Sequence, residues 1–309
     1  MGKTGPEGYG SFAADSWIIR AMTAVFLAIL SAVCGAFAHI LARKMAGLTT
    51  AREMVSFNFG LMTIMLLPGA PFFWQLALEP RGLFLFMGAV CLDAVANYCY
   101  FRSFERLSAV TASSLLAFSP VFVLALAPVL GAASGGFTLW QAIGVLMAAG
   151  GLWMLAHNPN VGDQLAADKA KRVEMIWPLA AAGLFGISVY LLKTIFSQGI
   201  ANPYTYYFVR APMIAILTAV ITRPNLKWVT RGSFGVTAGR LVFVIAQWLL
   251  LLYALEAGVP AVVKALGDLS PFFVVLLGWG FIREKPNRHQ VGGVILIVVS
   301  MGMITLGHG

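Results

Sequence analysis

The sequence has little charge, little cysteine and none of the short motifs that build most enzyme active sites. Only 11% of its 309 residues are charged and 60% are hydrophobic, whereas about a quarter of the residues in an average soluble domain are charged. The mean hydropathy is +0.84. A chain of this composition cannot hide its apolar side chains in one aqueous core, so we expect an all-α membrane protein that crosses the bilayer several times.

The three cysteines, Cys34, Cys91 and Cys99, lie singly in apolar stretches, without CxxC spacing or nearby histidines. We expect small buried hydrophobic residues, and we predict no metal and no cofactor. No HExxH motif, phosphate-binding loop or aspartate-rich metal motif occurs, which disfavours an enzyme and excludes a self-contained ATP-driven pump. A cleavable signal sequence is not expected. The basic residues lie mostly in short connectors, so nucleic acid is not expected as a partner.

Ten apolar stretches are long enough to cross the hydrocarbon core, which needs about 20 residues per helix. The predicted spans are Trp17–Leu41, Thr50–Pro68, Gly82–Phe101, Ser108–Leu130, Thr138–Ala156, Ile176–Ser197, Tyr204–Ile221, Gly235–Leu255, Val259–Ile282 and Gln290–Leu306. One long connector, residues 157–175, separates a first five-helix unit, 1–156, from a second, 176–309. The lipid bilayer is therefore the expected surrounding of both units.

The two halves repeat each other. LSAVTASSLLAFSP matches GVPAVVKALGDLSP when Ser119-Pro120 is aligned with Ser270-Pro271, and Glu105 then falls on Glu256. Because five is odd, two tandem five-span units must enter the membrane in opposite directions, which predicts an inverted repeat. Pro120 and Pro271 then occupy equivalent positions, as hinges or as static kinks that shape a cavity.

Several features together resemble a known family. They are the five-plus-five duplication, Tyr253-Ala254-Leu255 before a small-residue turn, Ser270-Pro271 in the ninth span, Glu284 after it and Gly292-Gly293 opening the tenth. In these the chain resembles EamA-type members of the drug/metabolite transporter superfamily, although residues 130–137 of the first half lack a counterpart of Glu284. The resemblance implies a substrate pathway between the halves, for amino acids, nucleotide precursors, organic cations or phosphorylated metabolites.

Lysine and arginine are distributed unevenly between the two sides of the predicted bundle. Fourteen lie in connectors after odd-numbered spans and three on the other side. The positive-inside rule then places the odd connectors in the cytoplasm and both termini outside a cytoplasmic (inner) membrane. The family resemblance favours termini inside the cell, so the two indications conflict.

Ionisable residues within the spans are the strongest indication of a binding site, because each is costly in hydrocarbon unless it faces protein or water. Lys193, Arg210 and Lys264 are expected toward one end of the bundle and Arg240 toward the other. Lys264 and Asp268 have the i, i+4 spacing of an ion pair. Either these long side chains reach the interface, or the first three share a cavity that favours an anionic or zwitterionic substrate.

Other polar and aromatic residues fall on single helix faces and extend the candidate substrate-binding set. They are Asp93, Asn97, Tyr100, Tyr190, Tyr206, Gln247 and Trp248. Interhelical hydrogen bonds and interfacial anchoring are the alternative roles for the neutral and aromatic members. Asp93 either pairs with a cation, such as Arg240 or Lys193, or carries a coupling proton. His39 and Asp268 are the other proton-coupling candidates.

The sequence thus predicts a secondary carrier that moves a small anionic or zwitterionic organic metabolite, such as an amino acid, by alternating access. An exporter of hydrophobic or cationic drug-like solutes is the alternative within this class. A membrane-embedded sensor or enzyme is the alternative from another class. The sequence does not determine the substrate, the coupling ion, the direction of transport, or whether the protein is a monomer or a homodimer.

Overall fold

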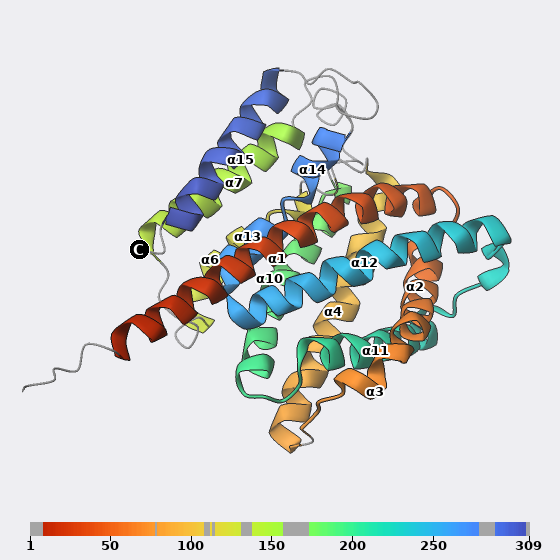
Figure 1. The fold of residues 1–309 in the computed structure, drawn as a ribbon. Coiled ribbons are helices and arrows are strands. Elements are labelled where there is room, and N and C mark those ends of the chain that lie inside the picture. Colours follow the sequence, from red (N-terminus) through yellow and green to blue (C-terminus); the bar gives the residue numbers. More distant parts are fainter. Residues whose placement is uncertain are drawn as a thin grey trace, which may run out of the picture.

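The chain folds into a bundle of helices, seen in the computed structural model of Figure 1. The structure describes residues 9–77, 79–107, 112, 115–130, 138–156, 173–277 and 288–306. In the first half the elements are α1 (Tyr9–Ala46), α2 (Ala51–Leu66), η1 (Leu67–Gly69), α3 (Ala70–Phe73), α4 (Pro80–Arg106), α6 (Ser119–Leu130) and α7 (Leu139–Ala156).

The second half is helical as well. Its elements are α10 (Ile176–Ser197), α11 (Pro203–Thr222), η2 (Leu226–Trp228), α12 (Arg231–Ala257), α13 (Pro260–Gly267), α14 (Ser270–Leu277) and α15 (Arg288–Leu306). Over the described ranges, β-type pairing is limited to one antiparallel bridge between Leu76 and Ala201. The all-α fold predicted from composition is therefore found in the part of the chain that the structure describes.

Six described segments are long and apolar enough to cross a membrane. They are Arg20–Ala46, Ala51–Phe73, Pro80–Glu105, Ile176–Ser197, Pro203–Thr222 and Arg231–Ala257. The remaining predicted spans correspond to α7 and α15 and to the shorter pieces α6, α13 and α14. Six crossings thus have structural support, and the total of ten stays a prediction.

The predicted alignment of the two halves is matched by the helix boundaries. In that register α4 and α12, each of 27 residues, coincide from end to end. The turns before Ser119 and Ser270 also coincide, because Phe118 N donates to Leu115 O at 3.2 Å and the equivalent Leu269 N donates to Leu266 O at 3.3 Å. The repeat is therefore a repeat of structure.

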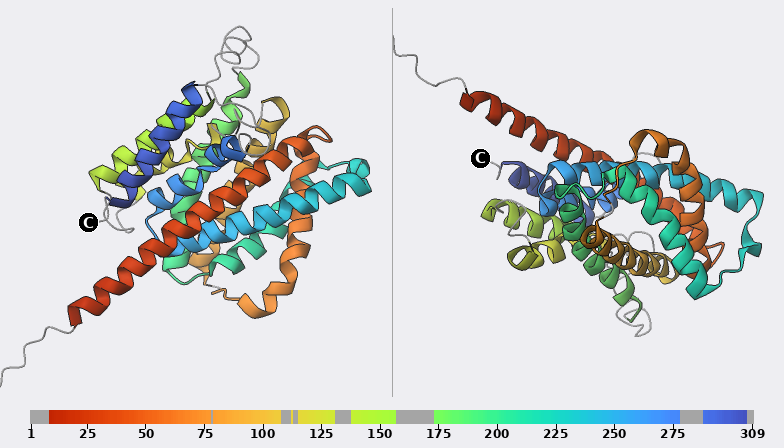
Figure 2. Two further views of the ribbon diagram at one scale, coloured as in Figure 1. Left: turned by 45° about the horizontal axis from the view of Figure 1, so that its top comes forward. Right: turned by 90° about the horizontal axis from the view of Figure 1, so that it is seen from below.

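Contacts between the halves follow the pattern of a two-fold axis. Helix α1 packs on α12 of the other half, and its counterpart α10 packs on α4. The equivalent helices α2 and α11 pack on each other, as do α7 and α15, and Figures 1 and 2 show these pairs side by side. Each half thus supplies the surface that covers the other.

Small buried residues lie on one face of α1, the helix that packs on α12. Ala24, Ala28 and Ala32 recur every fourth residue on one face of α1, and each is at most 2% exposed. Helices in a membrane associate through such faces, because small side chains allow extensive van der Waals contact between the backbones. This contact brings the middle of α12, with its buried Arg240, against the first half.

The two candidate hinge prolines do not lie inside continuous helices. Pro120 is the second residue of α6 and Pro271 the second residue of α14, each following a two-residue turn. Proline is well tolerated there, because the first helical N–H groups have no intrahelical acceptor. The fourth and ninth predicted spans are therefore broken helices. Bending at the breaks remains a prediction.

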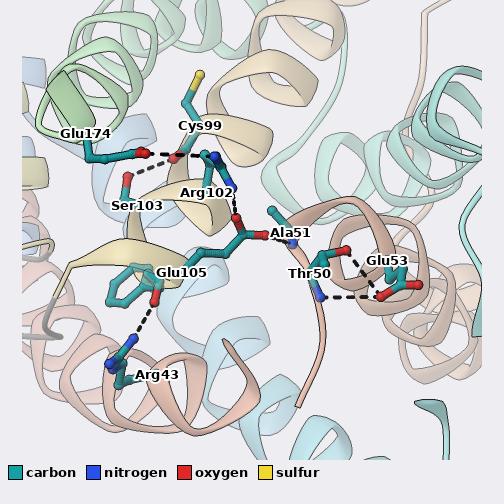
Figure 3. A network of polar contacts seen from close by, with 10 residues as sticks. Arg43, Thr50, Ala51, Glu53, Cys99, Arg102, Ser103, Glu105 and Glu174 are labelled. Atoms are coloured by element: carbon teal, nitrogen blue, oxygen red, sulfur yellow. Dashed lines mark hydrogen bonds and ion pairs between the residues drawn. The ribbon is translucent and has the colours of Figure 1, made fainter. Parts of the chain in front are cut away.

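Connectors that follow odd-numbered predicted spans meet at one end of the bundle, where they form the polar network of Figure 3. Glu105 pairs with Arg102 and accepts a hydrogen bond from the backbone N–H of Ala51. Arg102 also lies 3.9 Å from Glu174. We refer to this end as the basic end, because the sequence places most Lys and Arg residues in these connectors.

At the opposite end, the connector after α2 is bound to the start of α11. Asn202 Nδ2 donates to Phe73 O at 2.8 Å. The backbone N–H of Gln75 donates to Thr205 Oγ1, also at 2.8 Å. These bonds join the first half of the chain directly to the second at this end of the bundle.

Candidate substrate-binding site

A cavity of about 60 Å³ lies between the two halves. This volume has room for a few water molecules, since one water needs about 10–15 Å³. Nine residues predicted from the sequence line it: His39, Asn97, Tyr100, Arg210, Arg240, Gln247, Trp248, Lys264 and Asp268. Asp93, Tyr190, Lys193 and Tyr206 are not part of its lining.

Sequence reasoning missed several lining residues. Asn58 and Phe59 come from α2, Phe185 from α10 and Ser270 from the start of α14. Asn58 carried a signal, because it is the single amide side chain in the second predicted span. Phe185 carried none, since phenylalanine is common on every face of these helices.

Asp93 on α4 anchors a fully buried polar network. Its Oδ1 accepts a hydrogen bond from Ser188 Oγ at 2.7 Å, and its Oδ2 accepts one from Tyr206 O–H at 2.9 Å. Arg210 Nη1 lies 3.1 Å from the same Oδ2. The aspartate is 0% exposed and Arg210 is 1% exposed. The network joins α4 of the first half to α10 and α11 of the second.

The expected cation partner of Asp93 was wrong. Arg210 takes that position, whereas Arg240 and Lys193 form other contacts. An ion pair of this burial is costly to desolvate and is kept only with good geometry and further hydrogen bonds. Ser188 and Tyr206 supply those bonds to the carboxylate, so Asp93 is placed behind the cavity wall as a fixed counter-charge.

Arg210 faces the cavity from within a group of aromatic rings. Its guanidinium carbon lies 4.6 Å from the ring centre of Trp248, 5.1 Å from that of Tyr207 and 5.7 Å from that of Phe59. The ion pair with Asp93 lacks hydrogen-bond geometry, and none of the three guanidinium nitrogens has a hydrogen-bond partner among the described residues. A solute in the cavity therefore meets unused donors.

Arg240 on α12 is held by neutral groups. Its Nη1 donates to Asn58 Oδ1 at 2.5 Å, and its Nη2 lies 3.5 Å from the Tyr100 hydroxyl. Its Nε has no partner within the described part of the chain. Arg240 was expected toward the opposite end of the bundle from Arg210 and Lys264, and the structure brings all three side chains to the lining of one cavity.

Lys264 and Asp268 form the expected ion pair at the break between α13 and α14. Lys264 Nζ lies 2.7 Å from Asp268 Oδ1 and 5.8 Å from the ring centre of Phe185. Asp268 Oδ2 has no hydrogen-bond partner among the described residues. The pair thus closes one wall of the cavity and leaves one carboxylate oxygen unused.

Lys193 has a different role from the one its sequence position suggested. Its ammonium donates to carbonyls at the end of α12, those of Leu255, Glu256 and Gly258, at 2.9, 3.0 and 3.1 Å. In the first half, Arg43 of α1 similarly donates to Phe104 O near the end of α4, at 2.7 Å. A cation suits the carbonyl end of a helix. The predicted convergence of Lys193 with Arg210 and Lys264 is not found.

Tyr190 and Tyr206 also donate to protein groups outside the cavity. Tyr190 O–H donates to Val123 O at 2.7 Å, and Tyr206 O–H donates to Asp93. Among the described residues, three cations line the cavity, with Asp268 in the lining and Asp93 behind it. In this part of the chain, three positive charges and two carboxylates leave an excess of one positive charge.

Comparison with known proteins gives the family. A model of the EamA-like transporter family matches residues 22–156 and again residues 172–306. The chain belongs to the EamA-like transporter family. The two matches cover the two halves found in the fold, so each half of this EamA-like protein is one copy of the family's unit. The family is one of transporters, in agreement with the membrane-spanning helices.

Other comparisons add only the fold. One solved structure, described as "Crystal structure of protein", aligns with a TM-score of 0.71 over 93% of this chain and 99% of its own, at 15% identity. At that identity the likeness shows a shared fold and no shared substrate. A comparison with curated proteins finds no match.

Proposed function

We propose that this EamA-like protein is a secondary transporter that carries a small anionic or zwitterionic organic metabolite across the cytoplasmic membrane by alternating access. The observation that supports this substrate class most is the excess of cations around the cavity. Arg210, Arg240 and Lys264 line it together with one carboxylate, Asp268. Uncompensated charge is expensive inside a membrane protein and marks substrate or ion pathways.

The unused hydrogen-bond donors of two arginines support an acidic group in the solute. Arg210 and Arg240 both carry guanidinium nitrogens without a hydrogen-bond partner among the described residues. Arginine presents a planar set of donors that fits a carboxylate or phosphate with two parallel hydrogen bonds. The rings of Trp248 and Tyr207 fix the plane of Arg210, which lowers the entropy lost on binding.

The arrangement of the halves supports alternating access. Transporters with inverted repeats place the substrate between the repeats, beside broken helices. Here the turn at Asp268 and the start of α14 at Ser270 line the cavity. We propose ten crossings in two inverted five-helix units. The end of the bundle at which Asn202 is hydrogen-bonded to Phe73 would then be one of the two gates.

For orientation we propose that the basic end faces the cytoplasm, following the positive-inside rule. A cysteine introduced for the exposed Arg223 in a cysteine-free protein should be protected from a membrane-impermeant maleimide in intact cells. Labelling without permeabilisation would reverse the orientation.

A cationic drug-like solute fits this cavity less well. Asp268 is the carboxylate of its lining, and it is already paired with Lys264. Binding a cation would therefore add a fourth positive charge to a site with three. The aromatic side chains can pack against an organic solute of either charge, so they do not outweigh this electrostatic argument against a cation.

Uptake by the reconstituted protein tests the proposal. Proteoliposomes should accumulate labelled monocarboxylates or amino acids, and Arg240→Gln should reduce uptake at least tenfold, about the loss of one charged hydrogen bond. Lys227→Gln, at an exposed cation on η2, is the matched control and should leave uptake unchanged. Equal uptake by the Arg240 variant and wild type would contradict the assignment of the cavity.

A further inference from the structure

Asp268 occupies an unusual position among the charged groups of the cavity. Its side chain is 17% exposed and that of Lys264 is 7% exposed, and the two are joined through Oδ1 at 2.7 Å. The second oxygen, Oδ2, is buried and has no hydrogen-bond partner within the described residues. Asp268 also ends α13, immediately before the break that precedes α14. The carboxylate thus depends on one cation for its compensation.

Among the described residues, the charged and titratable groups that line the same cavity beside Lys264 and Asp268 come from four helices. They are His39 from α1, Tyr100 from α4, Arg210 from α11 and Arg240 from α12. Arg210 is already compensated by Asp93 from behind. Asp93 itself does not line the cavity and has both oxygens occupied, by Ser188 and Tyr206. Among the described residues, Asp268 is therefore the carboxylate that an entering solute would meet.

An anion in so small a cavity must act on Asp268. Asp268 lines this cavity of about 60 Å³, so the negative charge of a solute bound there shares one small space with the carboxylate. It either takes over part of the interaction with Lys264 or repels Asp268 directly. Both effects, together with burial, favour the neutral form of a carboxylic acid. One proton from water then adds to Asp268 and forms a carboxyl O–H, so that the anion's charge is balanced.

We propose that an anionic solute in the cavity and a proton on Asp268 support each other's binding, so that the carrier moves both in the same direction. This inference rests on the proposed function, because it needs an anion as substrate. It goes beyond the sequence-based expectation that Asp268 is a proton-coupling candidate, because it gives the direction of the coupling. The sign of the coupling follows from the sign of the solute's charge.

Proton uptake by purified protein measures this coupling. The protein in weakly buffered detergent solution at pH 7, with a pH-indicator dye, is titrated with acetate, pyruvate or benzoate. We expect about one proton taken up per anion bound, and an affinity that falls by up to about tenfold per pH unit as Asp268 loses its proton. Glu256→Gln, at an exposed carboxylate at the end of α12, should behave as wild type.

The variant Asp268→Asn imitates the protonated acid. It should take up no proton when the anion binds, and its affinity should not change between pH 6 and pH 8. Should this variant not fold, the pH dependence of anion affinity in the wild type decides alone. Anion binding without proton uptake, or with proton release, would overturn the inference and leave the proposed function intact. If none of the three anions nor any amino acid binds, the proposed function fails, and this inference fails with it.

Discussion

The buried pair of Asp93 and Arg210 yields the sharpest prediction on stability. In Asp93→Asn, Arg210 keeps its charge but loses its counter-charge at 3.1 Å, at a site where Arg210 is 1% exposed. Removing one partner of a buried ion pair costs about 3–5 kcal/mol, because the other charge stays buried without compensation. The asparagine side chain keeps one acceptor oxygen and presents its N–H groups to the other donor, either Ser188 or Tyr206, which adds about 1–3 kcal/mol if that donor is left unmatched.

The double variant Asp93→Asn, Arg210→Gln is the matched control. It removes both charges, so it should regain most of the stability that the single variant loses, because neutral replacement of a buried pair is often close to neutral in free energy. Unfolding in detergent, followed by circular dichroism, should rank wild type first, the double variant next and Asp93→Asn last. If the single and double variants lose the same stability, the two residues are not coupled and the network described here is wrong.

Further predictions concern residues beside the cavity. Lys193→Ala removes the donor to the end of α12 and should destabilise the fold by about 1–3 kcal/mol, while the anion affinity of the folded protein, measured by calorimetry, stays unchanged. A loss of affinity at equal stability would return Lys193 to the binding site. Gly35→Ala adds a methyl group that meets Ser270 Oγ and approaches Gln247 Nε2 to 2.8 Å. Since both line the cavity, anion binding should weaken roughly tenfold or more, as expected for shifts of about 1 Å. Gly60→Ala, with open space around the new methyl group, is the control, and equal binding by the two variants would show that the cavity tolerates the shift.

Sequence reasoning predicted the repeat and half of the residues that line the cavity for identifiable reasons. Ser119-Pro120 and Ser270-Pro271 revealed the repeat because they recur in one register with Glu105 and Glu256, although the sequence placed both pairs inside continuous spans and the structure shows each pair beginning a helix. Arg210, Lys264 and Asp268 could be assigned to protein-facing positions because ionisable groups are too costly to face lipid. These inferences depend on local chemistry and on the cost of charge in hydrocarbon, and the structure places all three side chains in one cavity.

The remaining details depend on contacts between helices, which periodicity does not reveal. Lys193 lies on the same helix as Tyr190, but its depth places the ammonium at the open carbonyl end of α12. The choice of Arg210 over Arg240 as partner of Asp93 follows from the packing of α11 and α4. Asn58 binds Arg240 only because α2 and α12 meet.

The charge selectivity of the cavity is the central claim and can be measured with pairs of solutes that differ in charge alone. Purified protein is titrated with benzoate and benzamide, and with acetate and acetamide, at one pH and ionic strength, and thermal stabilisation is recorded. The account predicts stabilisation by the acid of a pair and little by its amide, with the difference lost in Arg240→Gln. Equal stabilisation by acid and amide, or a preference for organic ammonium ions of similar size, would contradict it.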